Sequence, residues 1–165
     1  MALHSLRSVQ KIPAGPSVAW DFFSDPRNLE RITPPSMRFV IRSALPSLTV
    51  YAGQEIEYRV SPILRIPLYW KTEIVQVDDG RRFIDEQREG PFALWRHIHE
   101  FDPVEGGVQM KDFVEYENPL GILGEWANGL FVRRKVLEIF RYRFRKVEEI
   151  FGAWPDGQEM KIEIK

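Results

Sequence analysis

The sequence predicts one α+β domain in which a curved antiparallel sheet packs around a long C-terminal helix. Three observations predict this class. Between residues 37 and 117, short segments alternate apolar and polar side chains, as strands with one covered face do. After Asn118-Pro119 the apolar spacing becomes that of a helix. Turn-forming residues separate the strand-like segments, at Asp78-Asp79-Gly80, Gly90-Pro91 and Glu105-Gly106-Gly107.

The N-terminal part is expected to begin with a strand and a short helix. Residues 3–13 are expected to form the first strand, which ends at Pro13. After the turn at Ala14-Gly15-Pro16, residues 17–23 are expected to form a helix. Its buried side should comprise Val18, Trp20 and Phe22.

A second short helix and six more strands follow. Asp25 and Pro26 are typical of an N-cap and of the first position in a helix, and Thr33-Pro34-Pro35 should end that helix. The six strands bring the predicted total to seven. They are expected at residues 37–44, 53–62, 67–77, 81–89, 92–104 and 107–117.

One long amphipathic helix is expected over residues 122–151. Pro155-Asp156-Gly157 should end the domain, which gives a ligand-binding domain over residues 1–154 and a tail over 155–165. The end of the tail alternates, so both a frayed terminus and an edge strand remain open there. The helical spacing is carried by Leu123, Trp126, Leu130, Leu137, Phe140, Phe144, Val147 and Phe151.

The composition excludes several classes of function. The 23 basic and 24 acidic residues give a net charge of −1, so the chain has no overall electrostatic footprint for nucleic acid. It contains no cysteine, which excludes disulfides, thiolate nucleophiles and cysteine-bound metals. No segment reaches the ~20 apolar residues that a membrane-spanning helix needs, and the N-terminus has no signal-peptide core. We therefore expect a cytoplasmic protein, monomeric or weakly dimeric, that binds no nucleic acid.

Strand alternation divides the predicted sheet into two faces. The outer face carries charged residues and should contact water. The inner face is largely apolar and should pack against the long helix. It comprises Ile56, Tyr58, Val60, Trp70, Thr72, Ile74, Phe83, Asp85, Gln87, Trp95, His97, His99, Phe101, Met110, Asp112, Val114 and Tyr116.

The outer charges also predict how the strands are paired, because opposite charges prefer to lie directly across from one another. On the inner face, the resulting register places Asp85 beside His97 and Asp112 beside His99. We expect at least one of these His–Asp pairs to make a hydrogen bond, since a buried carboxylate is costly without a partner. The predicted ladder of outer charges runs through Glu57, Lys71, Glu86, Arg96 and Glu115.

The His97-x-His99 spacing suggests metal chemistry, because residues i and i+2 of a strand share a face, with Asp85 or Asp112 as a third ligand. The same residues could act as general acid and base. We favour a third interpretation, a structural or ligand-orienting polar cluster, and expect no metal and no cofactor.

The long helix carries many basic residues, which could indicate an acidic partner or a membrane surface. Glu138, Glu148 and Glu149 interleave with them, and this pattern favours a solvated face instead. The basic residues are Arg133, Arg134, Lys135, Arg141, Arg143, Arg145 and Lys146.

The order of elements resembles the helix-grip fold of the START/Bet v 1-like (SRPBCC) superfamily, over roughly residues 3–151. The local motifs look like its bacterial cyclase/dehydrase-like, or polyketide cyclase-like, branch. The loop over residues 43–52 lacks the glycine-rich stretch of the plant branch, so hormone-type binding is not expected. The matching segments are Asp25-Pro26-Arg27-Asn28-Leu29, Thr33-Pro34-Pro35, Phe83-Ile84-Asp85-Glu86-Gln87, Gly90-Pro91-Phe92 and Trp95-Arg96-His97-Ile98-His99-Glu100-Phe101.

The aromatic inner face could be ordinary core or the wall of a pocket, but a helix-grip sheet is too curved for one helix to fill, so the resemblance favours a cavity. We expect Trp70, Trp95, Tyr116 and the small residues Ala127 and Gly129 to border it, because small residues on a helix leave room. The resemblance implies a hydrophobic ligand such as a lipid, an isoprenoid or quinone, or a polyketide-like ring. The alternatives are a cyclase/dehydratase-type enzyme that uses a His–Asp pair, and a protein-interaction module. The predicted ligand-binding residues are Tyr58, Trp70, Thr72, Phe83, Asp85, Gln87, Trp95, His97, His99, Asp112, Val114, Tyr116, Trp126 and Leu130.

Overall fold

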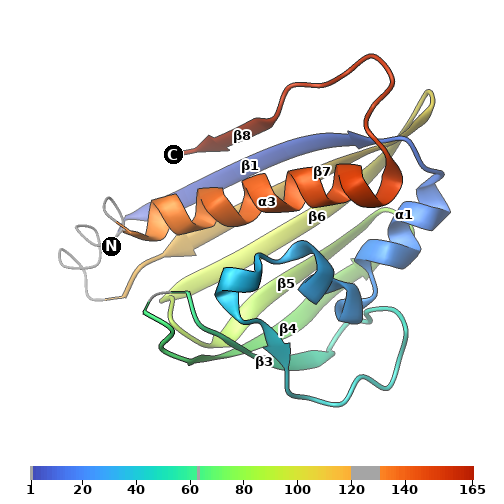
Figure 1. Cartoon of the computed structure of the whole chain (residues 1–165). Coiled ribbons are helices and arrows are strands. Elements are labelled where there is room, and N and C mark those ends of the chain that lie inside the picture. The colour runs from blue at the N-terminus through green and yellow to red at the C-terminus, as the bar shows by residue number, and fades with distance from the viewer. Residues whose placement is uncertain (1, 63, 120–130) are drawn as a thin grey trace.

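A computed structural model describes residues 2–62, 64–119 and 131–165 of the chain (Figure 1). Its elements are β1 (Leu3–Ile12), α1 (Pro16–Phe23), the 3-10 helices η1 (Pro26–Ile32) and η2 (Pro35–Met37), β2 (Val40–Ile41), β3 (Glu55–Val60), β4 (Leu68–Asp78), β5 (Arg82–Glu89), β6 (Leu94–Val104), β7 (Gly107–Glu117), α3 (Arg133–Phe151) and β8 (Lys161–Ile164).

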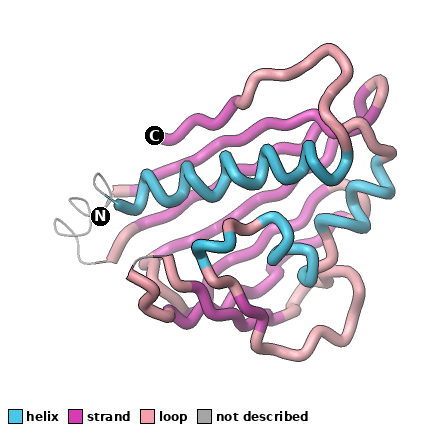
Figure 2. The backbone as a smooth tube through the Cα atoms, in the orientation of Figure 1, coloured by secondary structure: helices cyan, strands magenta, loops and turns pink. Residues whose placement is uncertain are grey.

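The strands form one antiparallel sheet, and the helices lie on one side of it (Figure 2). In Figure 1, α3 lies over the half of the sheet that contains β1, β7 and β6. The helix α1 lies on the same side of the sheet, near one end of α3. The strand order is β2-β3-β4-β5-β6-β7-β1-β8. The predicted α+β fold with a long C-terminal helix is therefore confirmed, and α3 supplies one wall of the core.

The described residues form eight strands, so the predicted total of seven is wrong. The additional strand, β8, pairs with β1, which would otherwise be an exposed edge with unpaired backbone groups. Ile162 and Ile164 alternate toward the core, and Gln158 makes two hydrogen bonds with the backbone of Lys11. The tail is thus an edge strand rather than a frayed end. The domain boundary after residue 154 stays a prediction.

The N-terminal helices differ in detail from the expectation. Val18 is 54% exposed, because a helix over 16–23 turns Ala19 and Trp20 toward the core and Val18 away from it. The predicted N-cap is confirmed, since the Asp25 carboxylate accepts a hydrogen bond from the backbone N–H of Arg27. The strand predicted over 37–44 is only two residues long.

The described part of the C-terminal helix runs from Arg133 to Phe151. Its buried residues Phe140, Phe144 and Val147 belong to the predicted apolar stripe. The segment over 122–130, which contains Leu123, Trp126, Ala127, Gly129 and Leu130, lies outside the described residues.

Three of the four predicted strand registers are confirmed, and the register between β4 and β5 is wrong. Lys71 pairs with Glu89 rather than Glu86, and Glu73 pairs with Glu86. The difference is already present at the turn, where Asp78 pairs with Arg82, three residues away from the predicted register. Two bulges farther along, at Val75 on β4 and Arg88 on β5, shift the pairing by one residue and back again.

The observed register gives the outer face other ion pairs than those predicted. Arg88 Nε lies 2.7 Å from Glu73 Oε2, and Arg88 Nη1 lies 3.0 Å from Glu86 Oε2, so one guanidinium serves two acidic neighbours. Lys71 Nζ instead lies 2.9 Å from Glu55 Oε2. Every residue of the predicted inner face is buried or partly buried, which confirms the face assignment.

Candidate functional site

A cavity of about 400 Å³ lies between the sheet, α3 and the η1 segment. Eight of the predicted ligand-binding residues line it: Tyr58, Trp70, Thr72, Phe83, Asp85, Trp95, His97 and His99. Four others, Gln87, Asp112, Val114 and Tyr116, do not contribute to its lining. The remaining two, Trp126 and Leu130, lie outside the described residues.

One side of the cavity is an aromatic wall, which we define as Phe39, Tyr58, Trp70, Phe92 and Trp95. The rings contact one another in sequence, with centroid distances of 5.0 Å for Phe39–Tyr58, 5.9 Å for Tyr58–Trp70 and 5.2 Å for Trp70–Trp95. These contacts are tilted, stacked and edge-to-face, respectively, and such ring contacts add to the free energy of apolar burial. The wall is thus a continuous apolar surface across β3, β4 and β6.

Gln87 holds part of this wall in place rather than facing the cavity. Its amide donates a hydrogen bond of 2.7 Å to the backbone carbonyl of Phe92, and its side-chain oxygen accepts one from the Phe92 backbone N–H. The turn between β5 and β6 is therefore tied back onto β5, and Phe92 is fixed against Trp70 and Trp95.

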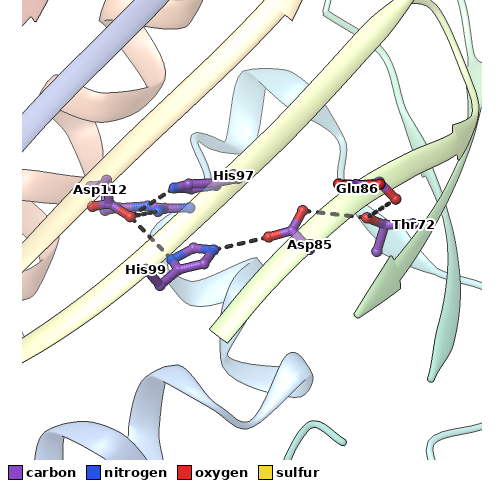
Figure 3. Close-up of polar contacts among 7 residues, drawn as sticks. Thr72, Asp85, Glu86, His97, His99 and Asp112 are labelled. Carbon is purple, nitrogen blue, oxygen red and sulfur yellow. Dashed lines mark hydrogen bonds and ion pairs between the residues drawn. The ribbon is translucent and has the colours of Figure 1, made fainter. Parts of the chain in front are cut away.

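Next to the aromatic wall lies a polar cluster, which we define as Asp85, His97, His99, Asp112 and Arg143. Figure 3 labels the two histidines and the two aspartates of this cluster. Nε2 of His97 lies 2.8 Å from Oδ1 of Asp112. Nε2 of His99 lies 3.0 Å from Oδ2 of Asp85, and its Nδ1 lies 3.1 Å from Oδ1 of Asp112. The two imidazole rings contact each other with their centroids 3.7 Å apart and their planes tilted by 34°. The predicted His–Asp contact is therefore confirmed twice.

The hydrogen bonds of the two histidines do not follow the predicted pairs. The backbone register is the predicted one, with Asp85 opposite His97 and Asp112 opposite His99. The shorter hydrogen bonds nevertheless run diagonally, from His97 to Asp112 and from His99 to Asp85. Diagonal neighbours on one face of a sheet lie within reach of long side chains, so register alone did not decide the partners.

Thr72 contacts the Asp85 carboxylate of this cluster and helps to fix its orientation. Its hydroxyl oxygen lies 3.3 Å from Oδ1 of Asp85 and 3.0 Å from the backbone carbonyl of Glu86 (Figure 3). The two carboxylate oxygens of Asp85 thus have different partners, Thr72 for one and His99 for the other.

Arg143 was missed by the sequence analysis, which assigned it to a solvated basic face. It is 8% exposed, and its Nη1 lies 3.4 Å from Oδ1 of Asp112. The guanidinium also lies over the ring of Phe140. Its burial could have been predicted from helical spacing, because Arg143 lies seven residues after Val136 and three after Phe140, on the buried stripe of α3.

The environment separates the two histidines electrostatically. Burial and the neighbouring His99 lower the pKa of His97 to about 4. Burial also opposes charge on His99, but its hydrogen bonds to Asp112 and Asp85 outweigh burial and raise its pKa. Burial alone would raise the pKa of Asp112, yet hydrogen bonds from His97 and His99 hold it well below its usual range. The cluster therefore favours a neutral His97 beside a charged His99.

Among residues 2–62, 64–119 and 131–165, Asp85, His97 and His99 form a group with the spacing of metal ligands. One ligand atom from each lies within 4.8 Å of the others. Within the same ranges, none of the helices has the length and hydropathy needed to cross a bilayer.

No protein-family model matches the chain, and no curated protein matches it. Several solved structures are similar to this chain. TTHA0849 from Thermus thermophilus gives a TM-score of 0.66 at 20% identity, over 88% of this chain and 94% of that chain. Major latex-like protein 151 from Panax ginseng gives 0.65 at 16% identity, over 90% and 97%. Ara h 8.0201 gives 0.59 at 14% identity, over 90% and 99%.

These structural neighbours are Bet v 1-like (SRPBCC) proteins, and at such identities they show the fold alone. The predicted helix-grip fold is confirmed. The assignment to the cyclase/dehydrase-like branch stays a prediction.

Proposed function

We propose that this protein binds a hydrophobic small molecule, such as a lipid, an isoprenoid or quinone, or a polyketide-like ring, in the cavity between the sheet and α3. The observation that carries this proposal is the cavity itself, which measures about 400 Å³ and is lined mainly by apolar side chains. Binding sites for small molecules are typically cavities of this size with a few polar groups among apolar ones.

The two sides of the cavity would have different roles in binding. The aromatic wall would remove the apolar part of the ligand from water, at roughly 25 cal/mol for each Å² buried. Asp85, His97 and His99 line the other side, so they would contact a polar atom of the ligand and fix its orientation. Asp112 does not line the cavity and would act by holding the two imidazoles.

Native mass spectrometry of the protein purified from its own cells tests the proposal. We expect an additional mass that is lost on extraction with organic solvent and that has the composition of an apolar molecule. A fluorescent apolar probe, 8-anilinonaphthalene-1-sulfonate, gives a second measurement on the recombinant chain. The proposal is wrong if no apolar molecule copurifies and the probe does not bind.

A matched pair of variants assigns probe binding to this cavity. Ile139 lines the cavity from α3, so Ile139→Trp should fill it and weaken probe binding at least tenfold. Arg141, two residues away, is exposed and contributes nothing to this lining, so Arg141→Trp should leave the affinity unchanged. Equal effects of the two substitutions would place the probe elsewhere.

A second candidate function is an acid–base enzyme of the cyclase/dehydratase type. The observation that favours it is the position of two imidazoles and a carboxylate on the wall of an otherwise apolar cavity. His97 or His99 would transfer a proton to or from the bound molecule, and Asp85 or Asp112 would orient the imidazole. Turnover of a poly-β-keto thioester, lost in His97→Gln and kept in His4→Gln, would support this function. A wild-type protein that binds such a substrate without converting it would exclude it.

A cytoplasmic location and a monomeric or weakly dimeric state stay predictions, as does the role of Trp126 and Leu130 in binding.

A further inference from the structure

Three ligand-type side chains converge on the cavity from β5 and β6. Asp85, His97 and His99 all line the cavity, and their ligand atoms lie within 4.8 Å of one another. Asp112 contacts both histidines but does not contribute to the lining, so it lies behind them. Two imidazole nitrogens and one carboxylate oxygen are a common ligand set for Zn²⁺ and for related divalent ions.

Each of the three side chains has its other polar atom close to a group outside this set. Asp112 Oδ1 contacts Nε2 of His97 and Nδ1 of His99, at 2.8 and 3.1 Å. The Thr72 hydroxyl lies 3.3 Å from Oδ1 of Asp85. The remaining atoms are Nδ1 of His97 and the pair of His99 Nε2 and Asp85 Oδ2, which contact each other at 3.0 Å. Outer partners that fix the ring orientation and the free carboxylate oxygen are typical of metal sites (Figure 3).

The charges of the cluster also suit a cation. Arg143, whose Nη1 lies 3.4 Å from Asp112, compensates the carboxylate that stands behind the histidines. Asp85 has no lysine or arginine partner among the described residues, and its Oδ2 contacts only the imidazole of His99 within this cluster, at 3.0 Å. A divalent ion would take the place of the proton held between His99 Nε2 and Asp85 Oδ2, and its binding would release that proton.

We propose that Oδ2 of Asp85, Nδ1 of His97 and Nε2 of His99 bind one divalent metal ion of the Zn²⁺ class, with Asp112 and Thr72 as the residues that orient these ligands. Three protein ligands leave a fourth position open, and the side of the cluster that is accessible is the cavity. That position suits an oxygen atom, either of water or of a carbonyl or hydroxyl group on the bound molecule. The proposal does not depend on the identity of the apolar ligand.

The test uses the full chain after treatment with a chelator. Zn²⁺ is added in an isothermal titration, and the histidine ring resonances are followed by ¹⁵N–¹H NMR. We expect one equivalent of Zn²⁺ to bind, with coupled changes in the ring resonances of His97 and His99 and none in those of His4. Co²⁺ in place of Zn²⁺ should give the visible absorption of a four-coordinate ion.

Variants then separate ligands from bystanders. Asp85→Asn and His97→Gln should each weaken Zn²⁺ binding at least tenfold, and Asp112→Asn should weaken it by about 10–100-fold. Asp102→Asn and His4→Gln, which change the same residue types outside the cluster, should leave the affinity unchanged.

Two results would overturn the proposal: the absence of stoichiometric Zn²⁺ binding, or binding that leaves the rings of His97 and His99 unshifted. Because the NMR measurement uses the wild-type chain, it decides the question even if a variant fails to fold. Binding of the apolar probe by the metal-free protein is measured separately, so failure of the metal site and failure of the proposed function are distinguishable.

Discussion

The aromatic wall and the polar cluster are stable for different physical reasons. The aromatic wall is held by ring contacts at centroid distances of 5.0–5.9 Å, and no single contact is indispensable because apolar attraction is non-directional. The polar cluster is held by hydrogen bonds and ion pairs in which Asp112 serves His97, His99 and Arg143 at once. Removal of one acceptor there leaves several buried donors without a partner.

This difference indicates which side of the cavity can change and which cannot. An apolar wall tolerates exchange of one apolar residue for another of similar volume, so the shape of the cavity can be altered at low cost. A buried polar network is stable only when all of its members are satisfied. The cluster is therefore expected to be the rigid part of the site.

The largest effect is expected from Asp112→Asn. The substitution keeps the shape of the side chain but removes the charge that compensates His99 and Arg143, so the free energy of unfolding should fall by about 3–5 kcal/mol. Asp102→Asn on β6 is the matched control, because Asp102 is a half-exposed partner of Lys111 and should cost at most about 1 kcal/mol. Urea denaturation measures both. Equal losses would show that the cluster behaves like a surface ion pair.

The free energy of unfolding of the metal-free protein should also change with pH, by less than the loss expected for Asp112→Asn. Burial and the charge of His99 lower the pKa of folded His97 to about 4, against about 6.5 in an unfolded chain. The unfolded state therefore binds more protons between pH 6.5 and 4, and stability should fall by roughly 1–3 kcal/mol as the pH is lowered through this window.

The two histidines contribute with opposite sign. The raised pKa of His99 gives stability that is fully present below pH 6.5 and lost as the pH rises through its folded pKa. His97→Gln should flatten the acid limb of the stability curve, whereas His4→Gln should leave it unchanged. An acid limb that survives in His97→Gln would assign it to other groups.

Two neighbouring inward-facing residues of β4 allow the stability contributed by a polar contact to be compared with that of an apolar one. Thr72→Val removes the hydroxyl that contacts Asp85, and should cost about 1–3 kcal/mol because a buried acceptor loses its partner. Ile74→Val, two residues along the same face, removes one buried methylene and should cost about 0.5–1.5 kcal/mol. Thermal unfolding of the two variants, side by side, measures the difference. A larger loss for Ile74→Val would reverse the comparison.

The smallest expected effect concerns the titration of His99. Asp112→Asn should lower the pKa of His99 in the metal-free protein, because the carboxylate near its Nδ1 favours the charged ring. Asp85→Asn should act in the same direction through Nε2. NMR titration of the ring resonances checks both. A titration that is unchanged in both variants would remove the pairing.

The face assignment could be predicted from the sequence because alternation is a local property. It placed Asp85, His97, His99 and Asp112 on one covered face, which is what the structure shows. Opposite charges across three strand pairs also predicted the correct register. The fold class followed from the change of period after Pro119.

Three features could not be predicted, each for a physical reason. The register between β4 and β5 is set by the turn between Asp78 and Arg82 and modified by bulges at Val75 and Arg88, and charge pairing encodes neither. Arg143 is buried because Asp112 compensates its charge, and that contact spans 31 residues of sequence. The diagonal hydrogen bonds of His97 and His99 depend on side-chain length and ring orientation rather than on backbone register.

Binding of an apolar molecule between the aromatic wall and α3 is the central claim. Intermolecular nuclear Overhauser effects between bound 8-anilinonaphthalene-1-sulfonate and the isotope-labelled chain test it most directly. We predict contacts from the naphthalene protons to the indoles of Trp70 and Trp95 and to the methyl groups of Ile139. Contacts confined to Leu64 and Ile66, which are 84% and 53% exposed, would contradict the claim and place the probe on the surface.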